Sequence, residues 1–413
     1  MNLKPFFLDA LPQLSFGVLL TFSSCIGQTF FISLFAGEIR NELNFSHGMF
    51  GTLYSSATLI SAIIFLWLGK LTDEFDLFLM GAFTLIALSV FSIIIANANT
   101  LLILFLSLFG LRLLGQSLLG HIVVVSMARW YEKKRGRALS IASLGHSIGE
   151  AILPMLIAFF LTFLTWREIW VGISICVAMI FFPISYCFSK YLKHQGINSS
   201  KSISIKKQVV SGNSWNRSQV LKDLRFYLLM PGILSSPFII TGVLFHQVHL
   251  VETKSWSLTM FASCYPLFAL STTIMTLVSG WLVDKLSAVH LLRFYLLPLG
   301  IGLLLLANTD KFYAAPVFMI LMGASAGAAN IILSTLWVEL YGNKYLGSIR
   351  SMCFAMLVLS TSMASGLMGF LIDMGITLES QLTTLSIYIF VCSISFAILT
   401  PSLVKYRSPP SLS

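Results

Sequence analysis

Twelve apolar segments, separated by short polar stretches, dominate this sequence of 413 residues. A helix needs about 20 mostly apolar residues to cross a lipid bilayer, and most of these segments have that length. We therefore expect transmembrane helices near residues 11–36, 47–69, 77–97, 101–126, 138–163, 168–189, 226–250, 257–281, 291–308, 312–338, 347–372 and 382–402. The predicted fold class is an all-α polytopic membrane protein with twelve transmembrane helices.

The composition supports this prediction and excludes other classes. Hydrophobic residues make up 57% of the chain and charged residues 10%, with a mean hydropathy of +0.88. Soluble chains are about a quarter charged, so a soluble globular protein is excluded. The net charge of +10 is spread over short loops without interleaved aromatic residues, so we expect no nucleic-acid partner. The six cysteines lie in apolar segments without metal-type spacing, which predicts neither a disulfide framework nor a structural metal.

A polar stretch near the middle of the chain divides the predicted helices into two sets of six. Residues 190–225 are rich in Ser, Asn and Lys, as is typical of a solvated linker. We predict an N-terminal six-helix bundle over 1–189, a cytoplasmic linker over 190–225, and a C-terminal bundle with a short cytoplasmic tail over 226–413. Because Met1–Gln13 has Lys4 as its only basic residue and leads into a full-length span, no cleavable signal peptide is expected.

The distribution of basic residues predicts the orientation. With a cytoplasmic N-terminus, only four of the 26 Lys and Arg residues fall on the outside, namely Arg40, Arg167, Lys254 and Lys311, while Arg112 falls within a span. Cytoplasmic loops carry the excess of Lys and Arg in membrane proteins. We therefore expect both termini to be cytoplasmic, and the protein to lie in the inner membrane of a bacterial-type cell.

The two halves repeat a short motif at a constant offset. Gly69-Lys-Leu-Thr-Asp73 follows the second predicted helix, and Gly280-Trp-Leu-Val-Asp284 closes the eighth. The same offset pairs Lys133 with Lys344, Gly136 with Gly347 and Ser140 with Ser351. An offset kept over this distance indicates an internal repeat and predicts two pseudo-symmetric bundles.

Twelve spans in two repeats, a basic central loop and the repeated GxLxD motif resemble the major facilitator superfamily of secondary transporters. Trp130-Tyr-Glu-Lys-Lys-Arg-Gly-Arg-Ala-Leu139, followed by Gly145, Gly149 and Pro154, is similar to the helix 4–5 region of its monocarboxylate-transporter-like members. The resemblance implies two bundles that expose a central site to each side in turn. It also implies that Gly69, Asp73, Gly280 and Asp284 belong to a gating motif.

The chain departs from the family pattern in two places. No basic residue follows Asp73 until after the third helix, and the first helix has Gly27-Gln28-Thr29 in mid-membrane instead of an acidic-Gly-aromatic signature. Asp73 and Asp76 have a second interpretation, because carboxylates at a helix start cap free N–H groups. Gly69 and Gly280 are expected to allow close backbone approach near the turn.

Arg112 and Glu150 are ionisable residues at similar depth in the fourth and fifth predicted helices. A charge in a membrane span is costly unless it is paired or faces a wet cavity, so each is a candidate functional group. We hypothesise an Arg112–Glu150 ion pair in which an anionic substrate replaces Glu150, or protonation of Glu150 releases Arg112. A permanent structural ion pair is the alternative.

Other polar residues in the spans are candidates for substrate contact or coupling. His146 precedes Glu150 by four residues on one helix face, which suits a proton-handling pair or a packed core histidine. His121 is expected to pack or hydrogen-bond locally. Gln28, Thr29, Gln116 and Asn330 are candidates for lining a central cavity, or for helix–helix hydrogen bonds. Trp337 is expected to pack, with stacking on an aromatic ligand as the alternative.

A third set of residues favours a different cargo. His246 and His249 share a face near the outer end of the seventh helix, and Met260 and Cys264 share a face near the outer start of the eighth. These side chains are suitable copper ligands. The stretch Phe245–Leu250 also resembles branches of the superfamily that import copper or riboflavin. Ordinary interfacial and core packing is the alternative for all four residues.

We predict a secondary transporter that moves a small organic anion, with protons as the candidate coupling ion. The sequence contains no P-loop and no recognisable nucleophile–base–orienter set, so neither an ATP-driven pump nor an enzyme is expected. We expect no cofactor, a lipid bilayer and a small molecule as partners, and a monomer. A copper or riboflavin importer and a non-transporting sensor or assembly subunit are the alternatives.

Overall fold

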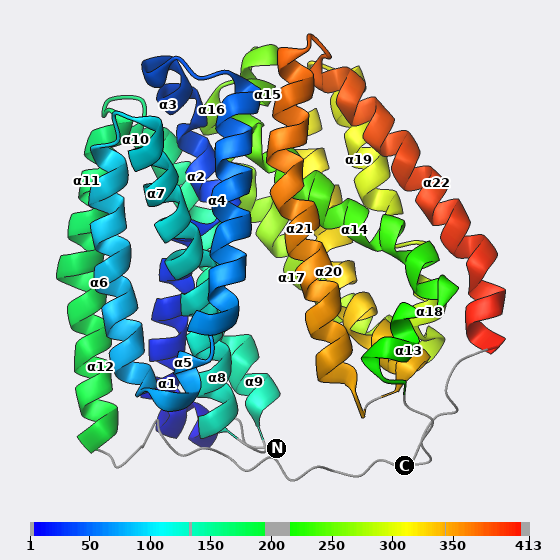
Figure 1. Cartoon of the computed structure of the whole chain (residues 1–413), viewed down its shortest axis with the longest axis horizontal. Coiled ribbons are helices and arrows are strands. Elements are labelled where there is room, and N and C mark those ends of the chain that lie inside the picture. Colours follow the sequence, from blue (N-terminus) through cyan, green and yellow to red (C-terminus); the bar gives the residue numbers. More distant parts are fainter. Residues whose placement is uncertain (1–3, 132–133, 195–214, 343, 406–413) are drawn as a thin grey trace. The chain divides into compact units, whose positions relative to one another are not determined.

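The computed structural model describes residues 4–131, 134–194, 215–342 and 344–405 (Figure 1). Every regular element within these ranges is helical. The chain divides into two compact units, Met1–Ile205 and Lys206–Ser413. Lys133 of the repeated motif and most of the predicted linker lie outside the described residues.

Within its described residues, the first unit contains five unbroken spans and one broken span. Its elements are α1 (Lys4–Ser24), η1 (Cys25–Gly27), α2 (Thr29–Ile32), η2 (Ser33–Phe35), α3 (Ala36–Leu43), α4 (His47–Leu68), α5 (Leu71–Glu74), α6 (Leu77–Ala96), α7 (Leu101–Leu111), η3 (Arg112–Leu119), α8 (Gly120–Trp130), α9 (Arg135–Ala142), α10 (Leu144–Phe160), α11 (Trp166–Cys176), η4 (Val177–Phe181) and α12 (Phe182–His194). Two of these elements, η3 and η4, are π-helical. Such wide turns are frequent at functional sites.

The second unit begins with a short helix at the end of the predicted linker. Its elements are α13 (Arg217–Leu221), α14 (Leu224–Phe245), α15 (Gln247–Thr253), α16 (Leu258–Ala262), α17 (Tyr265–Leu286), α18 (Ala288–Leu291), α19 (Leu297–Asn308), α20 (Ala314–Tyr341), α21 (Leu346–Asp373) and α22 (Leu378–Lys405).

Ten helices in the described ranges are long and apolar enough to cross a membrane. The first predicted span is an eleventh, bent by 51° between Leu11–Gly27 and Thr29–Leu43. The ninth predicted span contains only a short apolar helix, α19. Pro298 lies in the first turn of α19, and because proline has no N–H it cannot continue a ladder from the preceding turns. All twelve predicted segments are therefore helical, but two of them are irregular.

The predicted linker is too wide at both ends. Lys190–His194 continues α12, whereas α13 and the start of α14 lie within the predicted 215–225 portion. The Trp215 backbone N–H donates to the Tyr341 carbonyl (3.0 Å), and the Tyr341 hydroxyl donates to Asp223 (3.1 Å). These contacts hold the residues before α14 against α20. The polar composition of this stretch favoured a solvated linker. Composition carries no information on contacts with residues that are distant in the sequence, such as Tyr341.

Small residues bring α1 against α9 and α10. The Thr21 hydroxyl donates to the Ala142 carbonyl (2.6 Å), and the Cys25 thiol donates to the His146 carbonyl (3.5 Å). A Cβ at Gly145 would meet the Val18 carbonyl, and one at Gly149 would lie 2.6 Å from Cys25 Sγ. The predicted small-residue face of the fifth span is thus a helix–helix contact surface.

In the second unit, glycines fix the orientation of α20. A Cβ at Gly323 would lie 2.6 Å from the Phe268 carbonyl oxygen, and one at Gly327 would collide with the Thr272 carbonyl. The Thr276 hydroxyl of α17 also donates to the Gly327 carbonyl (3.3 Å). Because this face of α20 packs directly on α17, other faces of α20 remain available to line a cavity.

Candidate functional site

Arg112 is the largest charged side chain buried in the first unit, with 2% of its surface exposed. It lies where α7 passes into η3. Its Nε donates to the Thr58 hydroxyl of α4 (3.1 Å), and its Nη1 donates to the Gly27 carbonyl (2.9 Å). The guanidinium carbon lies 5.1 Å from the centroid of the Tyr54 ring. Three spans therefore enclose this cation.

The Gly27 carbonyl is available to Arg112 because the first span is broken there. Gln28 has an extended backbone with ψ 154°, so η1 ends at Gly27 and α2 starts at Thr29. A Cβ at Gly27 would collide with the Leu111 carbonyl and would lie 2.7 Å from Gly115 Cα. Gly27 and Gly115 therefore let the backbones of the first and fourth spans meet. The Arg112 guanidinium donates to the Gly27 carbonyl at the C-terminus of η1, where a positive charge is favourable.

Tyr54 and Thr58 contact Arg112, and neither residue was predicted from the sequence. Both are almost fully buried, and the Tyr54 hydroxyl donates to the Thr29 hydroxyl (2.8 Å). They lie four residues apart and therefore share one face of α4. That polar spacing was the available signal. Thr29 is thus a helix–helix hydrogen-bonding residue beside Arg112.

The predicted ion pair between Arg112 and Glu150 is not formed in this structure. The partners of Arg112 are a carbonyl, a hydroxyl and an aromatic ring, and no ion pair within the described residues includes it. The break in the first span is the physical reason, because Cys25 contacts α10 while Gly27 contacts Arg112. Arg112 and Glu150 were predicted to meet because they lie at equal depth on neighbouring helices. The first span instead contacts both α10 and Arg112.

Four further candidates carry polar groups without a partner. Glu150, His146, Gln28 and Gln116 are partly exposed, and their side chains form no hydrogen bond with any residue in the described ranges. The His146 ring packs edge-on against Phe30, with centroids 6.1 Å apart. The predicted His146–Glu150 pair therefore shares a helix face without a hydrogen bond between its members.

At the end of the second span, Asp73 and Asp76 have separate roles. Asp73 accepts from Arg129 at the end of α8 (3.1 Å), so the basic partner of this motif residue comes from the fourth span. Asp76 caps α6 by accepting from the N–H groups of Phe78 and Leu79 (2.8 and 3.2 Å), which confirms the capping interpretation for this residue. His121 lies 3.3 Å from the Thr72 hydroxyl, the local contact that was expected.

The two copies of the repeated motif differ. Gly69 ends α4, and a Cβ there would lie 3.1 Å from the Phe65 carbonyl oxygen. Gly280 lies inside α17 with open space around it, so the predicted close approach is wrong for this glycine. Asp284 is exposed on α17 and forms no ion pair with another described residue. The two copies of the motif are therefore similar in sequence but make different contacts in the two units.

The candidate copper ligands do not form a cluster. His246 is buried, and its Nε2 lies 3.0 Å from the Ser365 carbonyl. His249 is half-buried on α15, Met260 is 48% exposed, and the buried Cys264 thiol donates to the Met260 carbonyl (3.6 Å). Within the described residues, no three His, Cys, Asp or Glu side chains are grouped to hold a metal ion.

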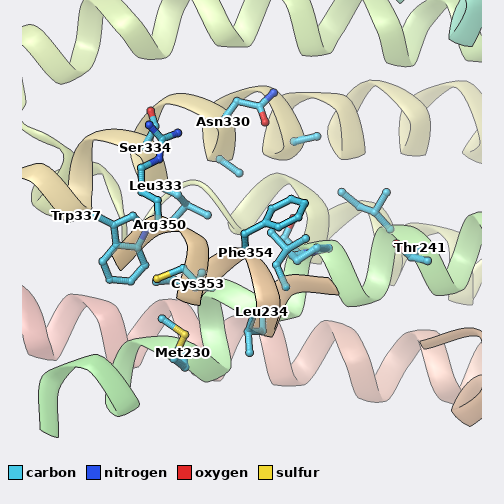
Figure 2. Close-up of a pocket in the computed structure, with 17 residues that line it drawn as sticks. Met230, Leu234, Thr241, Asn330, Leu333, Ser334, Trp337, Arg350, Cys353 and Phe354 are labelled. Atoms are coloured by element: carbon cyan, nitrogen blue, oxygen red, sulfur yellow. The ribbon is translucent and has the colours of Figure 1, made fainter. Parts of the chain in front are cut away.

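The remaining candidate, Asn330, lines a cavity of about 520 Å³ in the second unit (Figure 2). The walls are α14, α20 and α21, and the cavity also contains Ser334, Trp337 and Arg350. The predicted orientation places Arg350 among the cytoplasmic Lys and Arg residues and gives it no role in a cavity. Its position one turn inside α21 was the missed signal.

Comparisons with known structures agree on the fold. A bacterial homologue of the human lysosomal transporter Spinster, in an inward-facing and unoccupied conformation, matches with a TM-score of 0.72 and 15% identity, covering 99% of this chain and 100% of that chain. The nucleoside transporter NupG matches with a TM-score of 0.70 and 14% identity, covering 98% of this chain and 100% of that chain. The peptide transporter POT matches with a TM-score of 0.68 and 14% identity, covering 97% of this chain and 96% of that chain. No protein of curated function matches the sequence significantly.

A sequence model of the Major Facilitator Superfamily matches residues 17–364. The chain belongs to this superfamily. It is therefore a multi-pass membrane protein and a secondary transporter of a small molecule, not an enzyme.

Proposed function

We propose that this transporter moves a small organic anion, in the manner of the monocarboxylate-transporter-like branch, and that proton movement drives it. The observation that carries the proposal is the burial of Arg112 among neutral partners. A buried cation in a membrane span is costly without a compensating negative charge. A carboxylate substrate supplies that charge, and its binding then depends on the anionic group.

The free hydrogen-bonding groups near Arg112 support the same substrate class. A guanidinium has five N–H donors, and the two described hydrogen bonds leave others for a carboxylate. Arg–carboxylate bonds are charge-assisted and suit planar, bidentate recognition. Gln28 at the break and Gln116 one turn after Arg112 carry unpartnered amides on the elements that meet there.

Glu150 and His146 are the groups that we propose for proton coupling. Both lie in a membrane span on the face of α10 next to the first span. Each side chain can bind and release a proton, and neither is engaged in a described hydrogen bond. The break in the first span contacts α10 through Cys25 and Arg112 through Gly27, so movement of this segment links the two sites.

Uptake by purified protein in liposomes tests the proposal. The panel contains monocarboxylates, riboflavin and copper, each with and without an inward proton gradient. We expect gradient-driven uptake of a monocarboxylate, at least tenfold slower in Arg112→Gln. Glu150→Gln should still bind the anion but lose the response to the gradient.

Lys285→Gln is the matched control, because it removes a cation that stacks on Trp281 at the end of α17. This variant should transport normally. Uptake of riboflavin or copper that does not depend on Arg112 would refute the organic-anion proposal and support one of the alternative cargoes. Equal uptake by wild type and Arg112→Gln would refute the role of Arg112.

A further inference from the structure

The cavity of the second unit combines one cation with apolar walls. Its lining comes from one face of each of three helices, spaced three or four residues apart, as shown by Met230, Leu234 and Pro237 on α14. None of the described residues that line it is an Asp or a Glu. A volume of about 520 Å³ is within the usual range of small-molecule sites.

Arg350 gives this cavity its charge. The residue is exposed, and it forms neither an ion pair nor a hydrogen bond with any residue in the described portion of the chain. By contrast, the nearby Arg225 pairs with Asp223 (2.8 Å). A positive charge in a cavity without acidic residues attracts an anion, and a guanidinium binds a carboxylate or phosphate through paired N–H donors.

Two more polar groups in the cavity lack partners. The Asn330 amide and the Trp337 indole N–H form no hydrogen bond with other described residues, although only 4% of the Trp337 surface is exposed. Trp337 is held by ring contacts with Phe226 and Tyr341, at centroid distances of 5.9 and 6.2 Å. Figure 2 shows Asn330, Ser334 and Trp337 along the α20 wall, beside the α21 residue Arg350.

Apart from the hydroxyls of Ser236, Thr241 and Ser334 and the thiol of Cys353, the rest of the described lining is apolar. Leu234, Leu333, Phe354 and Leu357 contribute aliphatic and aromatic surface from all three helices. A small carboxylate such as lactate would leave this surface wet, whereas a ligand with a ring or an alkyl chain would cover it and gain about 25 cal/mol for each Å² of apolar surface removed from water.

We propose that the second unit contains a binding site for an amphipathic anion, with its anionic group on Arg350 and its apolar body against Phe354 and Leu333. Asn330 and the Trp337 N–H supply further hydrogen bonds to the anionic end. The described residues of this site belong to the second unit, whereas Arg112 belongs to the first. A soluble carboxylate with an aromatic or alkyl body and an anionic phospholipid share this chemistry.

Cys353 lines the same cavity and provides the readout. The rate of its alkylation by N-ethylmaleimide is measured by peptide-resolved mass spectrometry, with the exposed Cys187 of the first unit as internal reference. The soluble probe is 4-phenylbutyrate, with its uncharged amide as the matched compound. The lipid arm compares phosphatidylcholine nanodiscs with and without phosphatidylglycerol. Calorimetric titration of 4-phenylbutyrate is the second measurement.

We expect 4-phenylbutyrate to slow alkylation of Cys353 but not Cys187, and its amide to have little effect. Arg350→Gln should weaken binding at least tenfold, whereas Lys344→Gln, which removes a nearby cation outside the cavity, should not. Arg112→Gln should leave protection unchanged. Protection that requires phosphatidylglycerol and Arg350 would identify the lipid as the ligand and also support the site.

Three results would overturn the site. One is that neither 4-phenylbutyrate nor phosphatidylglycerol protects Cys353 from alkylation and that calorimetry detects no binding of 4-phenylbutyrate. Another is equal protection by the amide, and the third is protection that survives Arg350→Gln. Because these readouts measure binding in the second unit, they remain informative if the protein transports no organic anion.

Discussion

Arg112 makes its described contacts with the Gly27 carbonyl of the first span and with the Thr58 hydroxyl and the Tyr54 ring of α4. None of these partners carries a negative charge. Hydrogen bonds and a cation–π contact orient the guanidinium, but they leave its charge uncompensated. This uncompensated charge is the basis of the anion site that we propose at Arg112.

Removal of the Thr58 hydroxyl tests this arrangement. Thr58→Val keeps the shape but leaves the Arg112 Nε without its acceptor, which should destabilise the protein by about 1–3 kcal/mol and raise the KM for the anion. Thr273→Val is the control, because that hydroxyl bonds only to its own helix at Ala269 (2.9 Å). Thermal unfolding and uptake kinetics are the measurements. Equal effects of the two substitutions would contradict the positioning role.

The sequence identified Arg112 but not its partners. Its position inside an apolar segment was sufficient to predict a buried charge, whereas contacts with the first and second spans depend on how the helices pack. Asp76 was predictable because an N-cap depends on nearby residues. Arg350 was not predicted as a cavity residue because it lies only about one turn inside α21, close to the loop before that helix.

At the scale of elements, the crossing of the first and fourth spans depends on two glycines. A Cβ on Gly115 would lie 2.7 Å from Gly27 Cα and 2.8 Å from Gly27 N, closer than real atoms pack. The crossing places the end of η1 beside Arg112. The geometry of the candidate site therefore rests on this contact between backbones.

Gly115→Ala should destabilise the protein by about 1–3 kcal/mol or more, because the new methyl group must displace a backbone. Gly120→Ala is on the same span and has no atom within 4 Å of the added Cβ, so it should be neutral or stabilising by about 0.5–1 kcal/mol. Denaturant unfolding in detergent compares the two. If both variants are equally stable, the close crossing is absent from the folded protein.

Hydropathy predicted the elements well and their irregularities poorly. A span of about 20 apolar residues is visible in sequence whether or not its backbone is continuous. The extended Gln28 and the short α19 thus went unnoticed, although Pro298 marks the second case. The 51° bend has no hydropathy signal because hydropathy depends on residue type and not on the direction of the backbone.

At the scale of the whole molecule, the distribution of Lys and Arg predicts one orientation for all spans. Lys311 precedes α20 and Lys344 follows it, so the two ends of this helix should lie on opposite sides of the membrane. A membrane-impermeant maleimide should label Lys311→Cys in intact cells and Lys344→Cys only after permeabilisation. The reverse pattern would invert the proposed topology.

The central claim is that an anion compensates the buried charge of Arg112, and ligand-dependent thermal stability tests it most directly. A ligand that binds only the folded state stabilises it by about 2.7 kcal/mol at 100 times its Kd. The carboxylate that gives uptake should raise the Tm of the wild type, its uncharged amide should not, and Arg112→Gln should abolish the shift. An equal shift with the amide, or a full shift in Arg112→Gln, would contradict the claim.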